Sequence, residues 1–183
     1  MKILETFQTD VFLLEPVVYK DPRGELYESF RYDALSSILG RDICFVQENI
    51  SRSYKNVLRG IHFQSPHPQA KLIHVLKGEV YDVAVDLRPS SPHFGTWFAC
   101  NLSESNKRMI WIPEGFGHGA LSLTEETVMK YNLTDYYNPE GQHYVAWNDP
   151  DLEIDWPLDN KPILSEQDRK ACLIREIDFQ KFF

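Results

Sequence analysis

Hydrophobic and polar positions alternate in short runs along most of this chain. The runs are rich in β-branched and aromatic residues and are separated by glycine, proline, asparagine and aspartate, a pattern typical of strands joined by turns. It predicts strands over Val11–Tyr19, Gly24–Phe30, Cys44–Ser53, Val57–Phe63, Ala70–Lys77, Glu79–Leu87, Trp97–Leu102, Met109–Ile112, Gly119–Ser122, Thr127–Leu133 and Glu153–Ile154. We therefore expect an all-β fold.

Two short segments have helical features instead. Tyr32–Leu39 has apolar residues at helical spacing and ends at Gly40, and Ser165–Lys170 begins with a capping serine followed by acidic residues. In the predicted strands, alternation is clearest over Glu79–Leu87, where it indicates one buried face, as in a β-sandwich or jelly roll whose mouth can hold a ligand. Without a repeat or linker, residues 1–183 are expected to form one domain.

Composition narrows the possible partners and location. The chain has 183 residues, 43% of them hydrophobic, which is enough for a substantial core, and a net charge of −8, which argues against broad binding to nucleic acid or to anionic membranes. Its three cysteines, Cys44, Cys100 and Cys172, are widely spaced and form no CxxC motif, so a reducing cytoplasm fits best. No run approaches the ~20 apolar residues of a membrane span, and the N-terminus does not resemble a secretion signal.

His62 is the first candidate functional residue. It lies in the apolar strand predicted for Val57–Phe63, and a period of two puts it on one face with Leu58, Gly60 and Gln64, while Arg59 and Ile61 lie on the other. His62 is thus expected to face a cavity. A buried histidine bonded to the backbone is the alternative, and Arg59 alone would pass for half of a surface ion pair.

A second candidate is His118, in the segment Pro113-Glu114-Gly115-Phe116-Gly117-His118. The PxGxxH pattern resembles the second cupin motif, whose histidine can bind a metal. The first cupin motif would supply HxH, but this chain has His62-Phe63-Gln64 with no glutamate shortly after it, so too few ligands remain for a usual site. We expect no metal, and His118 either donates to a substrate oxygen or holds a strand turn.

A third group is the aromatic cluster that ends the strand predicted for Thr127–Leu133. Tyr131, Tyr136 and Tyr137 lie within seven positions of one another. Tyrosines in β-proteins are usually packing residues with one hydrogen bond, but together they can provide an acid and a stacking surface.

Ten ordered segments resemble the dTDP-4-dehydrorhamnose 3,5-epimerase family across nearly the whole chain. They are Asp21-Pro22-Arg23-Gly24, Gln47-x-Asn49-x-Ser51, Val57-Leu58-Arg59-Gly60-Ile61-His62-x-Gln64, Gln69-Ala70-Lys71-Leu72, Asp82–Arg88, Ser91-Pro92-x-Phe94-Gly95, Ile112-Pro113-x-Gly115-Phe116-x-His118-Gly119, Tyr131-x-x-Thr134-x-Tyr136-Tyr137, Trp147-Asn148-Asp149-Pro150 and Ile154-Asp155-Trp156-Pro157. The resemblance implies a cupin-like jelly roll and an isomerase that needs no cofactor. Its substrate would be a dTDP-4-keto-6-deoxyhexose, inverted at C3 and C5 in dTDP-rhamnose biosynthesis.

The resemblance also implies roles for particular residues. His62 matches the family's base, Asp168 the carboxylate paired with it, Lys71 the cation near the ketone and Tyr131 the acid on the opposite face. The residues implied in substrate binding are Arg23, Glu28, Gln47, Asn49, Arg59, His118 and Tyr137. Family members are dimers that exchange N-terminal strands, so Arg23 and Glu28 are expected to serve the neighbouring subunit's site.

Three positions depart from the family pattern. Ala120 replaces a common aromatic residue, and Gln142 and Ala146 replace a common glutamate and arginine. Such changes can alter the pocket, so an epimerase acting only at C3 or only at C5 stays an alternative. A jelly roll that binds a sugar nucleotide without turnover is a second alternative, although it would leave His62, Lys71, Tyr131 and Asp168 together unexplained.

Overall fold

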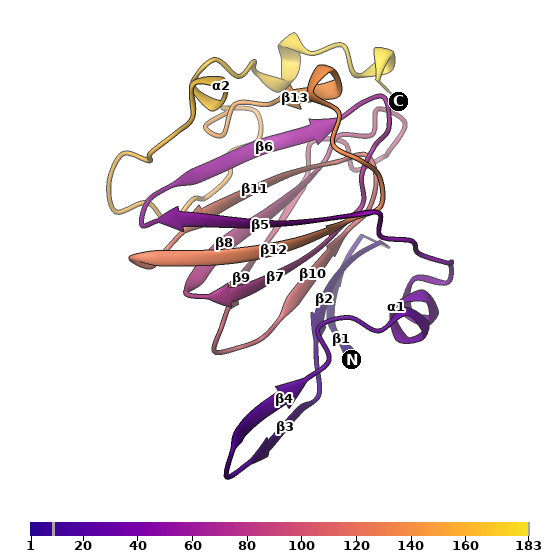
Figure 1. Cartoon of the computed structure of the whole chain (residues 1–183). Coiled ribbons are helices and arrows are strands. Elements are labelled where there is room, and N and C mark those ends of the chain that lie inside the picture. Colours follow the sequence, from indigo (N-terminus) through magenta and orange to yellow (C-terminus); the bar gives the residue numbers. More distant parts are fainter. Residues whose placement is uncertain (9, 183) are drawn as a thin grey trace.

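Two antiparallel sheets face one another in the computed structural model, which describes residues 1–8 and 10–182 (Figure 1). The six-stranded sheet has the order β1 (Lys2–Phe7), β2 (Val11–Glu15), β10 (Met109–Ile112), β7 (Lys71–Lys77), β12 (Glu126–Leu133) and β5 (Gln47–Tyr54). The five-stranded sheet has the order β13 (Gln142–Tyr144), β6 (Leu58–Gln64), β11 (Phe116–Ser122), β8 (Glu79–Asp86) and β9 (Trp97–Ser103). The predicted all-β sandwich is confirmed.

The remaining elements are short. A hairpin of β3 (Val18–Asp21) and β4 (Gly24–Tyr27) forms a separate two-stranded sheet. The α-helices are α1 (Tyr32–Leu39) and α2 (Glu166–Arg169), and the 3-10 helices are η1 (Pro139–Gly141), η2 (Ile174–Glu176) and η3 (Phe179–Lys181). The helix predicted for Tyr32–Leu39 is confirmed, and Ser165 caps α2 by accepting a hydrogen bond from the backbone N–H of Asp168.

Several predicted strand boundaries were wrong. Val11–Tyr19 is divided into β2 and β3 because Pro16 has no N–H to continue the ladder. Gly24–Phe30 ends early at Tyr27, Gly119–Ser122 begins earlier at Phe116, and Cys44–Ser53 begins later at Gln47. No strand forms at Glu153–Ile154, where Glu153 has a φ of 49°. The short or polar strands β1 and β13 were not predicted.

The space between the two sheets is filled at one end by apolar side chains. They come from both sheets and are Val11, Leu13, Ile73, Val75, Ile110, Ile112 and Met129 on one side and Val80, Ala84, Phe98, Leu102, Phe116 and Ala120 on the other. Full burial of a side chain of this kind stabilises a fold by about 1.5–3 kcal/mol. This core leaves the other end of the space open, between β5, β7 and β12 on one sheet and β6, β11 and β13 on the other.

Both outer faces are also covered in part, contrary to the prediction of one buried face. On β8, Val80 and Ala84 point into the space between the sheets, while Val83 and Val85 lie in a second cluster under the C-terminal segment with Trp156. A third cluster packs α1 against the outer face of the six-stranded sheet. Alternation cannot reveal this because apolar residues occupy both faces.

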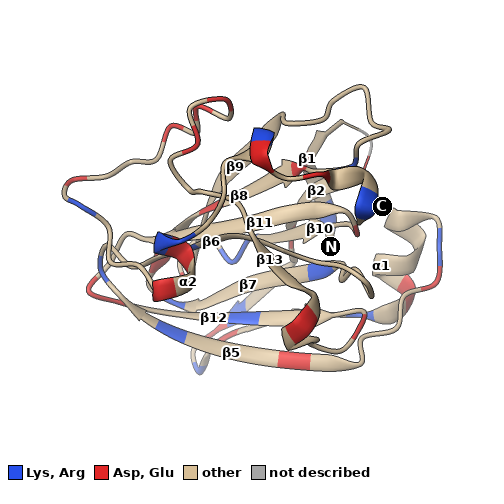
Figure 2. Cartoon of the chain, turned by 90° about the horizontal axis from the view of Figure 1, so that it is seen from above, with Lys and Arg blue, Asp and Glu red and all other residues tan. Residues whose placement is uncertain are grey.

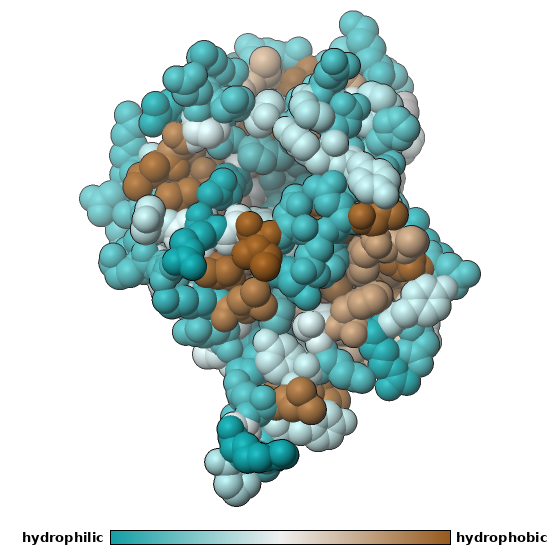
Figure 3. Space-filling view, viewed as in Figure 1, coloured by the Kyte–Doolittle hydropathy of each residue, from teal (hydrophilic) through white to brown (hydrophobic). Residues whose placement is uncertain are grey.

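The β3–β4 hairpin projects from the sandwich (Figure 1) and exposes apolar side chains. Tyr19 is 63% exposed and Leu26 is 72% exposed, and Figure 3 shows apolar atoms on this projection. At its base, Tyr27 Oη lies 3.2 Å from His74 Nε2, and nearer the turn Lys107 Nζ lies 2.6 Å from a carboxylate oxygen of Glu25. The hairpin is therefore bonded to the sandwich on one side and exposes Tyr19 and Leu26.

Charged residues of both signs are interspersed in the view of Figure 2, in which neither sign gathers on one face. Among the helices that the structure describes, none is long and apolar enough to cross a membrane.

Candidate active site

A pocket of about 600 Å³ occupies the open end of the space between the sheets. Its walls come from both sheets and from the loops beside them. The lining residues are Glu48, Asn49, Ile50, Ser51, Arg59, His62, Gln69, Lys71, His118, Tyr131, Leu133, Tyr137, Gln142 and Tyr144. Seven residues predicted for the site are thus brought together: Asn49, Arg59, His62, Lys71, His118, Tyr131 and Tyr137.

His62 and Asp168 form a pair at one wall of this pocket. His62 Nε2 lies 2.5 Å from Asp168 Oδ1, and the Ser165 hydroxyl donates to the other carboxylate oxygen at 2.7 Å. Burial alone would raise the pKa of Asp168, but hydrogen bonds from His62, Ser165 and the Gly60 backbone hold it below its usual value. An ionised carboxylate only accepts hydrogen bonds, so Nε2 carries a proton, and Nδ1 is the nitrogen that can act as a base in the neutral imidazole.

The predicted division of β6 into two faces was partly wrong. Arg59 lines the pocket together with His62, whereas Ile61 packs with Leu58 in the outer cluster. The register between β6 and β11 shifts here, and Gly60 has a φ of 123°. A Cβ at Gly60 would lie 2.5 Å from the Gly119 Cα, so only glycine fits this close approach of the strands. The irregularity breaks the period of two between Arg59 and His62.

His118 lies beside His62 on the neighbouring strand, with its Nε2 2.9 Å from Asp82 Oδ2. Both residues of this pair are buried. Burial lowers the pKa of His118, and the carboxylate of Asp82 opposes that effect. The second oxygen of Asp82 has no hydrogen-bond partner among the described residues. A negative charge therefore lies beneath the floor of the pocket.

Lys71, at the start of β7, brings a cation into the pocket. Burial lowers its pKa to about 8, although the negative charge of Asp82 raises it. The ammonium therefore stays mainly protonated at neutral pH. A protonated lysine in a partly enclosed pocket can stabilise negative charge on a nearby oxygen.

Tyr131 projects into the pocket from β12 and belongs to the sheet opposite His62. Its hydroxyl lies 3.0 Å from the hydroxyl of Ser51 on β5. Burial raises the pKa of Tyr131, and the hydrogen bond with Ser51 lowers it. The phenol is therefore a protonated group facing His62 from the other sheet.

The predicted binding residues fall into two groups. Arg59 donates through Nε to Ser53 Oγ at 3.0 Å, while Tyr137, half-exposed, completes the rim. Gln47 lies just behind the lining: its amide nitrogen donates to Asn49 at 3.0 Å, and its amide oxygen accepts from the Tyr137 backbone at 2.8 Å. These residues surround the mouth of the pocket.

Arg23 and Glu28, in contrast, are not brought into the pocket. Arg23 lies in the β3–β4 hairpin and pairs with Asp21 at 2.5 Å. Glu28 follows the hairpin and lies 3.8 Å from Arg31. Within one chain, then, these two predicted residues stand apart from His62.

Sequence reasoning assigned no role to several residues of the site, among them Tyr144, Asp82 and Ser51. Tyr144 was missed because β13 was not predicted. Asp82 and Ser51 belong to quoted segments but received no role, although period-two alternation in β8 and β5 already turns their side chains inward. Of the three departures, Gln142 lines the pocket, whereas Ala120 and Ala146 are buried away from it.

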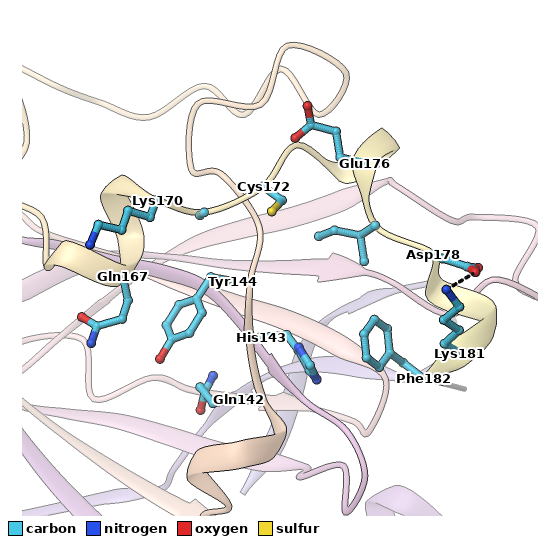
Figure 4. Close-up of a pocket in the computed structure, with 12 residues that line it drawn as sticks. Gln142, His143, Tyr144, Gln167, Lys170, Cys172, Glu176, Asp178, Lys181 and Phe182 are labelled. Atoms are coloured by element: carbon cyan, nitrogen blue, oxygen red, sulfur yellow. Dashed lines mark ion pairs between the residues drawn. The ribbon is translucent and has the colours of Figure 1, made fainter.

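A second pocket of about 550 Å³ adjoins the first (Figure 4). Gln142 and Tyr144 line both pockets, and Gln167 and Phe182 are among the residues that line only the second. Neither pocket supplies a metal centre: in the described part of the chain, no group of three or more His, Cys, Asp or Glu residues is placed to hold a metal ion.

Comparison with known proteins identifies the relatives of this chain. The sequence model of one family, dTDP-4-dehydrorhamnose 3,5-epimerase, matches residues 5–176. A Pseudomonas aeruginosa protein of that name is 46% identical over 178 residues, which cover 97% of this chain and 98% of the relative. A Streptomyces niveus dTDP-4-dehydrorhamnose 3-epimerase is 37% identical over 91% of this chain and 80% of its own.

Solved structures lead to the same family. A Legionella pneumophila dTDP-6-deoxy-D-glucose-3,5-epimerase, in complex with dTDP-4-keto-L-rhamnose, superposes with a TM-score of 0.96 at 46% identity, covering 99% of this chain and 96% of the other. The fold and its pocket therefore define a sugar-nucleotide epimerase of the cupin type, an isomerase. More particularly, this chain belongs to the dTDP-4-dehydrorhamnose 3,5-epimerase family.

Proposed function

We propose that the pocket converts dTDP-4-dehydro-6-deoxy-D-glucose to dTDP-4-dehydro-L-rhamnose by inverting C3 and C5, in dTDP-rhamnose biosynthesis. One observation carries this proposal: His62, which is bonded to Asp168, and Tyr131 belong to opposite sheets and border the same pocket. Inversion beside a ketone needs a base on one face of the sugar ring and an acid on the other. A sugar held between the sheets meets both.

The base in this proposal is Nδ1 of His62. It takes the proton from C3, the electron pair of the broken C–H bond forms a double bond between C3 and C4, and the π pair of the C4 carbonyl moves to its oxygen to give an enolate. Asp168, ionised because its pKa is held low, stabilises the imidazolium that forms. His62 then passes its extra proton to solvent before the next step.

Tyr131 returns a proton to the opposite face of the same carbon. Lys71, protonated at neutral pH, stabilises the enolate oxygen in the meantime. The phenol is a suitable acid because its raised pKa keeps it protonated until a strongly basic carbon takes the proton. Tyr131 then regains a proton from solvent, and the same residues act at C5 after the sugar ring turns in the pocket.

Arg59 is proposed to bind the diphosphate, since a guanidinium matches phosphate oxygens with paired donors. Gln47 and Asn49 contact the base and sugar, Tyr137 stacks on the thymine, and His118 lies near the hexose. The exposed position of Tyr137 at the rim suits stacking on a base that lies partly outside the pocket.

We further propose that the protein acts as a homodimer that exchanges N-terminal strands. The projecting hairpin (Figure 1) exposes Tyr19 and Leu26, and Arg23 in this hairpin does not line the pocket of its own chain. In addition, β5 ends the six-stranded sheet beside the pocket, so its outer edge is free to pair with another strand. Arg23 and Glu28 would then complete the site of the second copy.

A cytoplasmic location is proposed as well. Cys44, Cys100 and Cys172 are free thiols in the structure, as suits a reducing compartment.

Turnover in deuterium oxide tests the proposed reaction. Incubation with dTDP-4-keto-6-deoxyglucose should place deuterium at C3 and C5, detected by NMR and mass spectrometry. Deuterium at C3 alone would instead assign the activity of the Streptomyces niveus relative, named a 3-epimerase. No exchange at either carbon would refute the proposal, as would wild-type exchange in a His62→Ala variant.

A further inference from the structure

Three rings lie in a row across the five-stranded sheet. The register pairs Tyr144 of β13 directly with His62 of β6, and His62 in turn with His118 of β11. All three side chains line the pocket. His62 is therefore flanked on both sides by aromatic rings from neighbouring strands.

These three rings make two edge-to-face contacts, and the closer one joins Tyr144 and His62. The ring centroids of Tyr144 and His62 are 5.0 Å apart and the ring planes stand at 79°, an edge-to-face arrangement. His118 has its own edge-to-face contact, with Tyr131 at 6.1 Å. The base and the acid of the proposed reaction, His62 and Tyr131, are thus each in edge-to-face contact with a neighbouring ring.

We infer that Tyr144 is a positioning residue for His62, holding its imidazole so that Nδ1 points into the pocket. The inference rests on the proposed function, in which His62 is the base. Among the residues that the structure describes, only Asp168 forms a side-chain hydrogen bond with the His62 ring. One such bond fixes the proton on Nε2 but leaves the ring able to rock about it, and the Tyr144 ring removes that freedom.

The backbone of β13 is well placed to hold Tyr144 for this task. Next to it, Val145 exchanges both backbone hydrogen bonds with Ile61, at 2.9 and 3.1 Å, and Ala146 donates to the Cys172 carbonyl at 2.8 Å. The strand is therefore fixed to β6 on one side and to the C-terminal segment on the other. This anchored backbone fixes the point from which the Tyr144 side chain extends.

The space on the far side of the Tyr144 ring is open. Beyond the ring lies the second pocket, of about 550 Å³, into which Figure 4 shows the ring projecting near Gln142 and Gln167. A truncated side chain would join the two pockets and leave one side of His62 open to solvent. Misplacing a catalytic group by about 1 Å can cost a hundredfold in rate.

The ring of Tyr144, rather than its hydroxyl, holds the His62 imidazole in position. Burial raises the pKa of Tyr144, and the negative charge of Asp168 adds to that effect, so the phenol stays neutral and adds no charge beside the base. Tyr144→Phe keeps the ring and Tyr144→Ala removes it, so comparing these variants separates the effect of the ring from that of the hydroxyl. Tyr54→Ala is a matched control, because Tyr54 is 70% exposed on β5 and does not line the pocket.

Kinetics of deuterium exchange at C3 provide the first test. Tyr144→Ala should lower kcat about tenfold or more, with KM changed by less than about threefold, since the lost effect acts on the proton transfer and not on binding. Tyr144→Phe and Tyr54→Ala should keep kcat within about twofold of wild type. A Tyr144→Ala enzyme with wild-type kcat, or a Phe variant as slow as the Ala variant, would overturn the inference.

A second test does not depend on turnover. In the ligand-free protein, nitrogen-15 NMR should show His62 in the Nε2-protonated tautomer, in wild type and in Tyr144→Phe. In Tyr144→Ala the imidazole signals should broaden or average between tautomers. Unchanged signals in the Ala variant would refute positioning by Tyr144 even if the wild-type protein failed to epimerise this substrate, so this failure is distinct from that of the proposed reaction.

Discussion

The carboxylate of Asp168 lies 2.5 Å from the imidazole of His62, although the two residues are 106 positions apart in the chain. The contact depends on the cap of α2. Ser165 accepts a hydrogen bond from the Asp168 backbone and donates one to its carboxylate, and so sets the direction of that side chain. A short capped turn in the C-terminal segment thereby orients a residue on β6 of the five-stranded sheet.

Replacing Asp168 by asparagine should reduce exchange at C3 and C5 by about a hundredfold or more, because the amide cannot stabilise an imidazolium and permits the wrong tautomer. Stopped-flow or NMR measurement of deuterium uptake gives the loss. Binding of dTDP, measured by calorimetry, should be nearly unchanged because Asp168 lies behind His62 and does not line the pocket. Full activity in Asp168→Asn would show that the pair plays no part in proton transfer.

The activity should also fall at alkaline pH as Lys71 loses its proton. The pKa of Lys71 is lowered to about 8, so the charged form that stabilises an enolate dominates below that pH and is lost above it. The pH profile of kcat/KM for C3 exchange should therefore decline through about pH 8. In Lys71→Arg the guanidinium stays protonated, and the decline should move to higher pH whatever the absolute rate. An identical alkaline limb in both enzymes would assign the titration to another group.

Asp82 should set the pH at which kcat/KM declines on the alkaline side, without contacting the substrate. Its charge is what raises the pKa of Lys71 against the effect of burial, so Asp82→Asn should lower that pKa further and shift the decline to lower pH. Asp86→Asn is the control, since Asp86 is an equally buried carboxylate on the same strand that pairs with Arg88 instead. A limb that moves equally in both variants would point to a general structural effect.

Much of this site could be predicted from the sequence, for different reasons in different places. Alternation along Val57–Phe63 turned His62 towards a cavity, and the resemblance to the family supplied Asp168, which no local pattern connects with a strand 106 positions away. Alternation failed at Ile61, because a close approach that admits only glycine at Gly60 and a register shift break the period of two.

Other features were out of reach because they depend on tertiary packing. The strand β13 has three residues, Gln142–Tyr144, with no apolar alternation, and it exists because it pairs with β6. Tyr144 therefore could not be placed beside His62 in advance. The cover over the outer face of β8 comes from segments such as the one with Trp156, whose contacts the sequence does not reveal.

The final prediction concerns the proposed exchange of hairpins between two copies. If Arg23 serves the neighbouring site, a chain carrying Arg23→Ala and a chain carrying His62→Ala should complement each other. In a mixed dimer, one site then has His62 from the first chain and Arg23 from the second, both intact, while the other site lacks both. Random mixing of equal amounts puts one of each chain in about half of the dimers, so about a quarter of all sites should be fully restored.

The assay uses substrate well below KM, where loss of a phosphate contact is most visible, after the two chains have been mixed, denatured and refolded together. Arg23→Ala alone should raise KM with little change in kcat, as expected for a residue that only binds. If Arg23 instead acted within its own chain, no mixed site would contain both side chains and mixing would restore nothing.

Light scattering should show a dimer for both chains, and Leu26→Asp, which places a charge on the exposed apolar surface of the hairpin, should shift that dimer towards monomer. A monomeric wild-type protein with full activity would refute the exchange. Within one chain, Arg23 pairs with Asp21 and does not line the pocket that contains His62, so it could not bind the substrate there.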